Sequence, residues 1–130
     1  MQPITSTEIL SKEEYERARP DLRRRLIALK AKRRVPVGDH ATVHFETRAT
    51  MLYQVHEMLR AEDSWLRPGA VEDELEAYNP LIPAGGELSA TLMLEYDTAE
   101  ERAHHLQKLV GLDRHLWLTV GDTEPVAALF

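Results

Sequence analysis

The stretch YNPLIPAGGELSATLMLEY, residues 78–96, joins two kinds of secondary structure in this 130-residue chain. Pro80 has no amide hydrogen and restricts Asn79 away from the helical region, so a preceding helix must end here. After the two glycines, apolar and polar residues alternate, which is typical of a strand with one buried face. We expect Leu81 and Ile82, between these elements, to pack into the core. The stretch therefore predicts an α+β protein.

The rest of the chain continues this pattern on both sides. Apolar residues at helical spacing predict helices, and strict alternation predicts strands. The expected helices cover residues 20–34, 50–63, 70–78 and 98–110, and the expected strands cover residues 40–47, 87–96, 115–120 and 126–130. Pro20 is expected in a first helical turn, Thr50 and Thr98 are expected as caps, and the acidic residues of the 70–78 helix are expected to face solvent. We predict an antiparallel sheet of about four strands packed with three to four helices, in a single domain over residues 1–130.

Composition excludes several classes of protein. The chain has no cysteine, which excludes disulfides, thiolate metal sites and cysteine nucleophiles. No apolar run approaches the roughly 20 residues that a membrane span needs, and the first residues lack the basic and apolar parts of a signal peptide. We therefore expect a cytoplasmic protein without membrane contact. The chain ends on an apolar run at Phe130, as a chain truncated at its C-terminus would.

Charge is distributed unevenly along the chain. Residues 1–34 carry ten Lys or Arg and five Asp or Glu, giving +5, whereas residues 35–130 carry six and seventeen, giving −11. This difference separates a basic N-terminal helical segment, about 12–34, from an α+β body, about 35–130. The expected basic patch consists of Arg23, Arg24, Arg25, Lys32, Arg33 and Arg34. It can bind an acidic partner or a polyanion, or it can lie over the acidic surface of its own chain.

The sequence contains no strong catalytic or metal-binding motif. The signatures of phosphate-binding loops, dinucleotide-binding folds, serine hydrolases and zinc proteases are all absent. Glu101 and His104 are three residues apart, as in the Glu-x-x-His element of di-iron helical bundles. Such a bundle needs a second element of this kind, which the sequence lacks. These two residues are therefore weak metal candidates, with a solvated helix face as the alternative, and no cofactor is predicted.

Four residues form a polar stripe on the helix expected at 50–63: Tyr53, His56, Glu57 and Arg60. Their spacing of i, i+3, i+4 and i+7 places them on one helical face. A tyrosine, a carboxylate and an arginine together can bind an anionic ligand or the polar groups of another protein. The alternative is a pair of intrahelical salt bridges on a solvated surface. We expect Arg60 to be partly buried against residues 78–83, with Asn79 in the same site.

Most of the chain, from about Tyr15 to Val120, resembles a bacterial family known as domain of unknown function 3501. MLYQVHEMLR, residues 51–60, and AYNPLIP, residues 77–83, are the most specific stretches. The resemblance implies a glutamine in relatives at the position of His56, and relatives that continue beyond the last strand. It also implies genes that lie beside those of a rubrerythrin and of an iron–sulfur oxidoreductase, and hence a setting of peroxide or redox stress. The family implies no established activity.

Three hypotheses for function follow. The first is a non-enzymatic cytoplasmic accessory protein that binds a protein partner, such as a rubrerythrin or an iron–sulfur oxidoreductase, in a redox stress system. The second is a metal- or ligand-dependent enzyme that uses the polar stripe. The third is nucleic-acid binding through the basic patch, which is weakened by the absence of interleaved aromatic residues and of a known binding motif.

Overall fold

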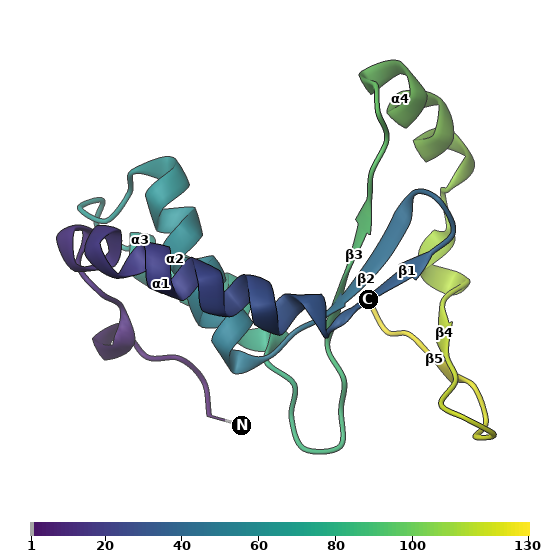
Figure 1. The fold of residues 1–130 in the computed structure, drawn as a ribbon, viewed down its shortest axis with the longest axis horizontal. Coiled ribbons are helices and arrows are strands. Elements are labelled where there is room, and N and C mark those ends of the chain that lie inside the picture. The colour runs from purple at the N-terminus through teal and green to yellow at the C-terminus, as the bar shows by residue number, and fades with distance from the viewer. Residues whose placement is uncertain (1) are drawn as a thin grey trace. The chain divides into compact units, whose positions relative to one another are not determined.

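The computed structural model describes residues 2–130, which form two compact units, residues 2–94 and 95–130. The first unit contains three α-helices, two short 3₁₀ helices and a three-stranded sheet (Figure 1). In chain order these elements are η1 (Ser6–Glu8), α1 (Lys12–Ala31), β1 (Arg34–Val37), β2 (Ala41–Phe45), α2 (Arg48–Glu62), α3 (Ala70–Tyr78), η2 (Asn79–Leu81) and β3 (Ala90–Leu94).

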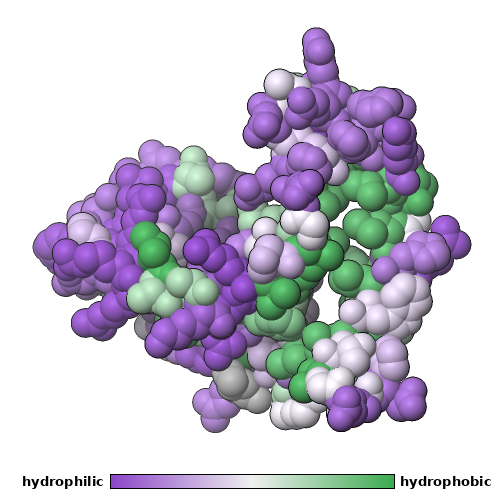
Figure 2. Space-filling view, turned by 45° about the vertical axis from the view of Figure 1, so that its right-hand side comes forward, coloured by the Kyte–Doolittle hydropathy of each residue, from purple (hydrophilic) through white to green (hydrophobic). Residues whose placement is uncertain are grey.

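The sheet is antiparallel, with β2 in the centre between β1 and β3. Val43 of β2 lies opposite Val35 on one side and Leu92 on the other. Directly opposed residues of antiparallel strands share a face, so these three residues and their alternate neighbours form an apolar face. Hydrophobic side chains also reach the surface, as the green areas of Figure 2 show. Val35 and Val37 are 47% and 50% exposed.

Strand β1 was not predicted, because its first residue, Arg34, belongs to the helix expected at residues 20–34, and Pro36 is typical of the end of such a helix. Proline is excluded from central strands but is tolerated on an edge strand. β1 occupies such an edge. The predicted strands at 40–47 and 87–96 are confirmed in shorter form as β2 and β3.

Helix α1 begins at Lys12, so the prediction that it begins at Pro20 is wrong. Ser11 caps the helix: its hydroxyl accepts the Glu14 amide hydrogen, and the Glu14 carboxylate accepts that of Ser11. Pro20 therefore lies inside the helix, where it removes one backbone hydrogen bond. Burial of Tyr15 before it and Leu26 after it stabilises both halves of the helix.

The core of the first unit lies between α2, α3 and the residues before α1. It consists of Ile4, Met51, Val55, Leu59, Ala70 and Leu75. The cap of α2 is Thr47 and not Thr50, because the Thr47 hydroxyl accepts the amide hydrogen of Thr50. Ile82 packs partly against the core, as expected, whereas Leu81 is exposed.

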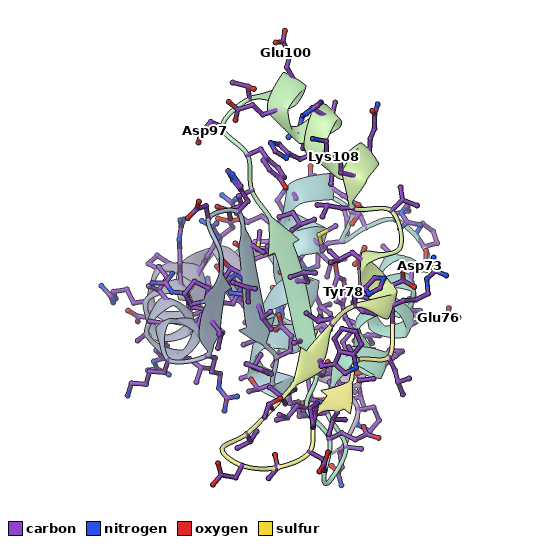
Figure 3. All side chains as sticks on the ribbon, turned by 90° about the vertical axis from the view of Figure 1, so that its right-hand side faces the viewer. Asp73, Glu76, Tyr78, Asp97, Glu100 and Lys108 are labelled. Carbon is purple, nitrogen blue, oxygen red and sulfur yellow. The ribbon has the colours of Figure 1, made fainter. Side chains whose placement is uncertain are left out.

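Helix α3 has the predicted bounds but not the predicted distribution of acidic residues. Asp73 and Glu76 point away from the protein (Figure 3). Glu74 is instead buried, and this burial raises the pKa of its carboxyl. Ala70 and Glu74 are four residues apart, so they share the face of α3 that is buried.

The second unit contains α4 (Ala99–Lys108), η3 (Leu112–Arg114) and a hairpin of β4 (Trp117–Leu118) and β5 (Val126–Ala127). The Thr98 hydroxyl accepts the amide hydrogen of Glu101, which confirms Thr98 as the cap of α4. Tyr96 stacks on His105 with ring centroids 4.9 Å apart. Asp97, Glu100 and Lys108 project away from the ribbon (Figure 3).

Residues 2–130 thus form four α-helices, a three-stranded antiparallel sheet and a two-stranded hairpin, which confirms the predicted α+β class. Among the described residues, none of the helices has both the length and the apolar character needed to cross a bilayer.

Candidate functional site

The polar stripe of α2 contacts α1 through a cluster centred on Glu57. Its carboxylate accepts hydrogen bonds from Arg19 Nε at 3.0 Å and Nη2 at 2.9 Å, so the arginine binds both oxygens. The hydroxyls of Tyr15 and Tyr53 donate to the same carboxylate at 2.7 and 3.0 Å. The side chains of Arg19 and Glu57 are only 21% and 22% exposed. We call Tyr15, Arg19, Tyr53 and Glu57 the Glu57 cluster.

The electrostatics of the Glu57 cluster favour one fixed set of protonation states. Hydrogen bonds from Arg19 lower the pKa of Glu57 to about 2. Burial and the neighbouring carboxylate raise the pKa of both Tyr15 and Tyr53. The carboxylate is therefore ionised and the phenols stay protonated at neutral pH. The Glu57 carboxylate thus accepts four hydrogen bonds. Because two of its partners, Tyr15 and Arg19, belong to α1, the cluster holds α1 on α2.

His56 connects α2 to the chain before α1. It is 3% exposed, and its ring stacks on Tyr15 with centroids 4.6 Å apart. The Leu10 amide donates to Nε2 at 2.9 Å, so Nε2 carries no hydrogen and Nδ1 must donate to the Leu52 carbonyl, also at 2.9 Å. Burial lowers the pKa of His56 and favours this neutral tautomer. Trp65 Nε1 adds a bond to the Leu10 carbonyl at 3.0 Å.

This arrangement predicts a dependence of stability on pH. Because the pKa of folded His56 lies below 6.5, its contribution is complete above pH 6.5 and is lost as the pH falls below that value. Protonated Nε2 would also face the Leu10 amide hydrogen. Glutamine at this position keeps an acceptor but cannot titrate. Between pH 7.5 and 5.5, we expect the native protein to lose on the order of 1 kcal/mol more of its free energy of unfolding than His56→Gln does.

Urea denaturation of both proteins at the two pH values measures this difference. The other five histidines are common to both proteins, so their contributions cancel. Equal losses would contradict the assignment of the neutral tautomer.

Arg60 and Asn79 do not lie in one site. Arg60 Nε donates to Glu16 of α1 at 2.8 Å, and both side chains are more than 40% exposed. The prediction that Arg60 is buried against residues 78–83 is therefore wrong, because Arg60 pairs with α1 instead. Asn79 instead binds the backbone of Ile4: its Oδ1 accepts the Ile4 amide at 2.7 Å and its Nδ2 donates to the Ile4 carbonyl at 3.0 Å.

Arg48 also fixes the residues before α1. It donates to the carbonyls of Gln2 and Pro3 and to the carboxylate of Glu8. Tyr15, Arg19 and Arg48 were not predicted as partners of the candidate residues. Tyr15 and Arg19 are four residues apart and thus share one face of α1, which is a signal that was available in the sequence.

The remaining candidates lie on the surface. The residues of the basic patch are exposed, except for the half-buried Arg33, and Arg24 forms an ion pair with Asp21. Glu101 and His104 are exposed on α4. In residues 2–130, no three His, Asp or Glu side chains are grouped so that they could hold a metal ion.

An open hollow of about 760 Å³ lies between the residues before α1 and the α2–α3 connection. Its apolar lining comes from Ile9, Leu10, Trp65, Leu66 and Val71, and Lys12 and Asp63 form an ion pair at its rim. None of the polar-stripe residues lines this hollow.

Comparisons with known proteins show a family and a similar fold. Residues 3–130 match the model of a family described as "Protein of unknown function (DUF3501)". A crystal structure of a novel protein of unknown function from Burkholderia pseudomallei K96243 is similar, with a TM-score of 0.88 and 39% sequence identity. The similarity covers 97% of this chain and 71% of that chain. No curated protein matches significantly. The chain therefore belongs to the DUF3501 family.

Proposed function

We propose that this chain is a non-enzymatic accessory protein that binds a protein partner through the basic patch and the adjoining sheet. The observation that carries the proposal is a contrast between two surfaces: the polar stripe of α2, and the apolar residues of β1. The polar stripe is occupied by bonds within the chain, whereas Val35 and Val37 on β1 are about half exposed. An enzyme would need titratable groups that converge on a pocket. The Glu57 cluster instead uses its groups to hold two helices together.

Basic residues and exposed apolar residues are adjacent at the start of β1. Lys32 and Arg33 connect α1 to this strand, and Arg34 is its first residue. Val35 and Val37 follow at once, on the face that they share with Val43 of β2. Such a surface suits a partner with an apolar centre and an acidic rim, since basic residues speed association with an acidic surface and apolar contacts stabilise the complex.

The family resemblance suggests which proteins to test. The first candidates are a rubrerythrin and an iron–sulfur oxidoreductase, because the resemblance implies that genes for such proteins lie beside those of relatives. The redox stress setting comes with them. Isothermal titration of each purified protein with this chain measures binding directly. We expect one of them to bind, and we expect Arg23→Glu, Arg24→Glu and Arg25→Glu together to weaken binding at least tenfold.

The control reverses three exposed basic residues outside the patch: Arg17→Glu, Arg102→Glu and Lys108→Glu. It changes the net charge by the same amount and is expected to bind within a few-fold of the native protein. The patch variant should keep its thermal stability, because exposed substitutions usually change it by about 0.5 kcal/mol or less. Equal weakening by both variants would contradict a specific patch. Binding of neither protein, together with salt-dependent binding of duplex DNA, would favour the nucleic-acid hypothesis instead.

A further inference from the structure

Strand β3 forms one edge of the sheet, and no other strand within residues 2–130 pairs with its outer side. The backbone bonds identify which groups face outward. The Glu46 amide donates to the Ser89 carbonyl at 2.8 Å, so the backbone of Ser89 points toward β2. Backbone direction alternates along a strand. The N–H and C=O groups of Ala90, Leu92 and Leu94 therefore point away from the sheet.

The opposite edge is protected from pairing. The Phe45 amide donates to the Arg33 carbonyl at 2.9 Å, so the backbone of Arg33 points toward β2. By the same alternation, Arg34 and Pro36 of β1 point outward. Proline has no N–H to offer there, and a charged residue also opposes edge-to-edge association. β3 has neither device, since its sequence ATLML contains no proline and no charge.

We propose that the outer edge of β3 pairs antiparallel with β3 of a second copy of this chain. The proposal does not depend on the function proposed above. A two-fold axis perpendicular to the sheet relates the two copies, so the apolar faces of both sheets lie on the same side. The axis passes between Leu92 and Leu92 of the second copy, which lie opposite each other. Leu92 then forms two hydrogen bonds across the axis, and Ala90 and Leu94 pair with each other on either side. Every outward-facing backbone group of the strand is satisfied.

The side chains fit the same register. Ala90, Leu92 and Leu94 belong to the apolar face of the sheet, so pairing extends that face across two copies. Thr91 and Met93 lie opposite each other on the other face. No like charges meet, because the strand has none. The same patch serves both subunits, which is the commonest form of closed assembly. A different protein would have to supply a matching strand, whereas a second copy already has one.

The absence of cysteine allows a direct test of the register. In the proposed pair, the Cα atoms of the two Leu92 residues are about 5.5 Å apart, within the roughly 4.4–6.8 Å that a disulfide spans. Leu92→Cys should therefore form a covalent dimer under mild oxidation. Val37→Cys is the matched control: this residue is half exposed, but on the β1 edge. Two copies of residue 37 would lie more than about 24 Å apart, because five strand spacings of about 4.8 Å each separate the two β1 strands.

Sedimentation or light scattering tests the pairing without a cross-link. The native protein should have twice the chain mass of 14.9 kDa. Ala90→Pro removes an outward N–H and no bond to β2, so it should have the mass of a single chain. Leu92→Lys gives a second variant if Ala90→Pro fails to fold, because it brings two like charges together at the axis. A native protein with the mass of one chain would overturn the proposal. So would dimeric Ala90→Pro, or cross-linking of Val37→Cys as fast as Leu92→Cys.

Discussion

Glu57→Ala is expected to lower the free energy of unfolding by about 3–5 kcal/mol, because it removes the acceptor of a mostly buried ion pair. Arg19 loses both of its charge-assisted bonds, and the hydroxyls of Tyr15 and Tyr53 lose their acceptor as well. Urea denaturation, monitored by circular dichroism, measures this loss. Glu16→Ala is the matched control, since Glu16 binds Arg60 on an exposed surface. That variant should cost only about 0.2–1 kcal/mol.

The pH dependence of the stability difference between the native protein and Glu57→Ala provides a second test of the Glu57 cluster. The pKa of Glu57 falls from 4.5 to about 2 on folding. Its contribution to stability is therefore complete above pH 4.5 and is lost as the pH falls toward 2. The difference between the native protein and Glu57→Ala should shrink over this range. A loss similar to that of Glu16→Ala at neutral pH would mean that the cluster does not hold α1 on α2.

Tyr15→Ala is expected to cost a similar amount, about 3–5 kcal/mol, because the ring is completely buried and leaves a cavity. The ring lies between two neighbours: it stacks on His56 at 4.6 Å and contacts Trp65 with centroids 5.9 Å apart. Tyr15→Phe keeps the ring and removes only the bond to the Glu57 carboxylate. Its cost should be about 1.5–3 kcal/mol.

Urea denaturation of Tyr15→Ala and Tyr15→Phe separates the contribution of the ring to stability from that of the hydroxyl. Circular dichroism follows both unfolding curves, and the midpoint and slope of each curve give its free energy of unfolding. If Tyr15→Ala costs no more than Tyr15→Phe, packing of the ring contributes little and the hydroxyl is the main contact between α1 and α2.

The sequence predicted best what depends on neighbours along the chain. The bounds of α3 and the Thr98 cap of α4 follow from spacing and capping within one element. The partners of the polar stripe depend on contacts between distant residues. Glu57 meets Tyr15 across 42 positions and Arg19 across 38. One sequence can show that Glu57 lies on a polar face, but not which helix covers that face.

Proline illustrates the same limit in both kinds of secondary structure. Pro20 suggested a helix start, and the strand that contains Pro36 was not predicted. Both differences arise because the wider structure compensates for a missing hydrogen bond. Pro20 lies in a helix that is capped nine residues earlier and buried on one side. Pro36 lies on a sheet edge, where its nitrogen has no partner to lose.

The bond between Ile4 and Asn79 has a consequence for the order of events during synthesis. The two residues are 75 positions apart, and Ile4 is among the most buried residues of the first unit. A growing chain emerges from its N-terminus, so Ile4 leaves the ribosome many residues before its partner exists. At about 5–20 residues per second, the delay lasts several seconds. During that interval the native site of Ile4 is incomplete, and the first unit cannot close before the stretch around residue 79 is released.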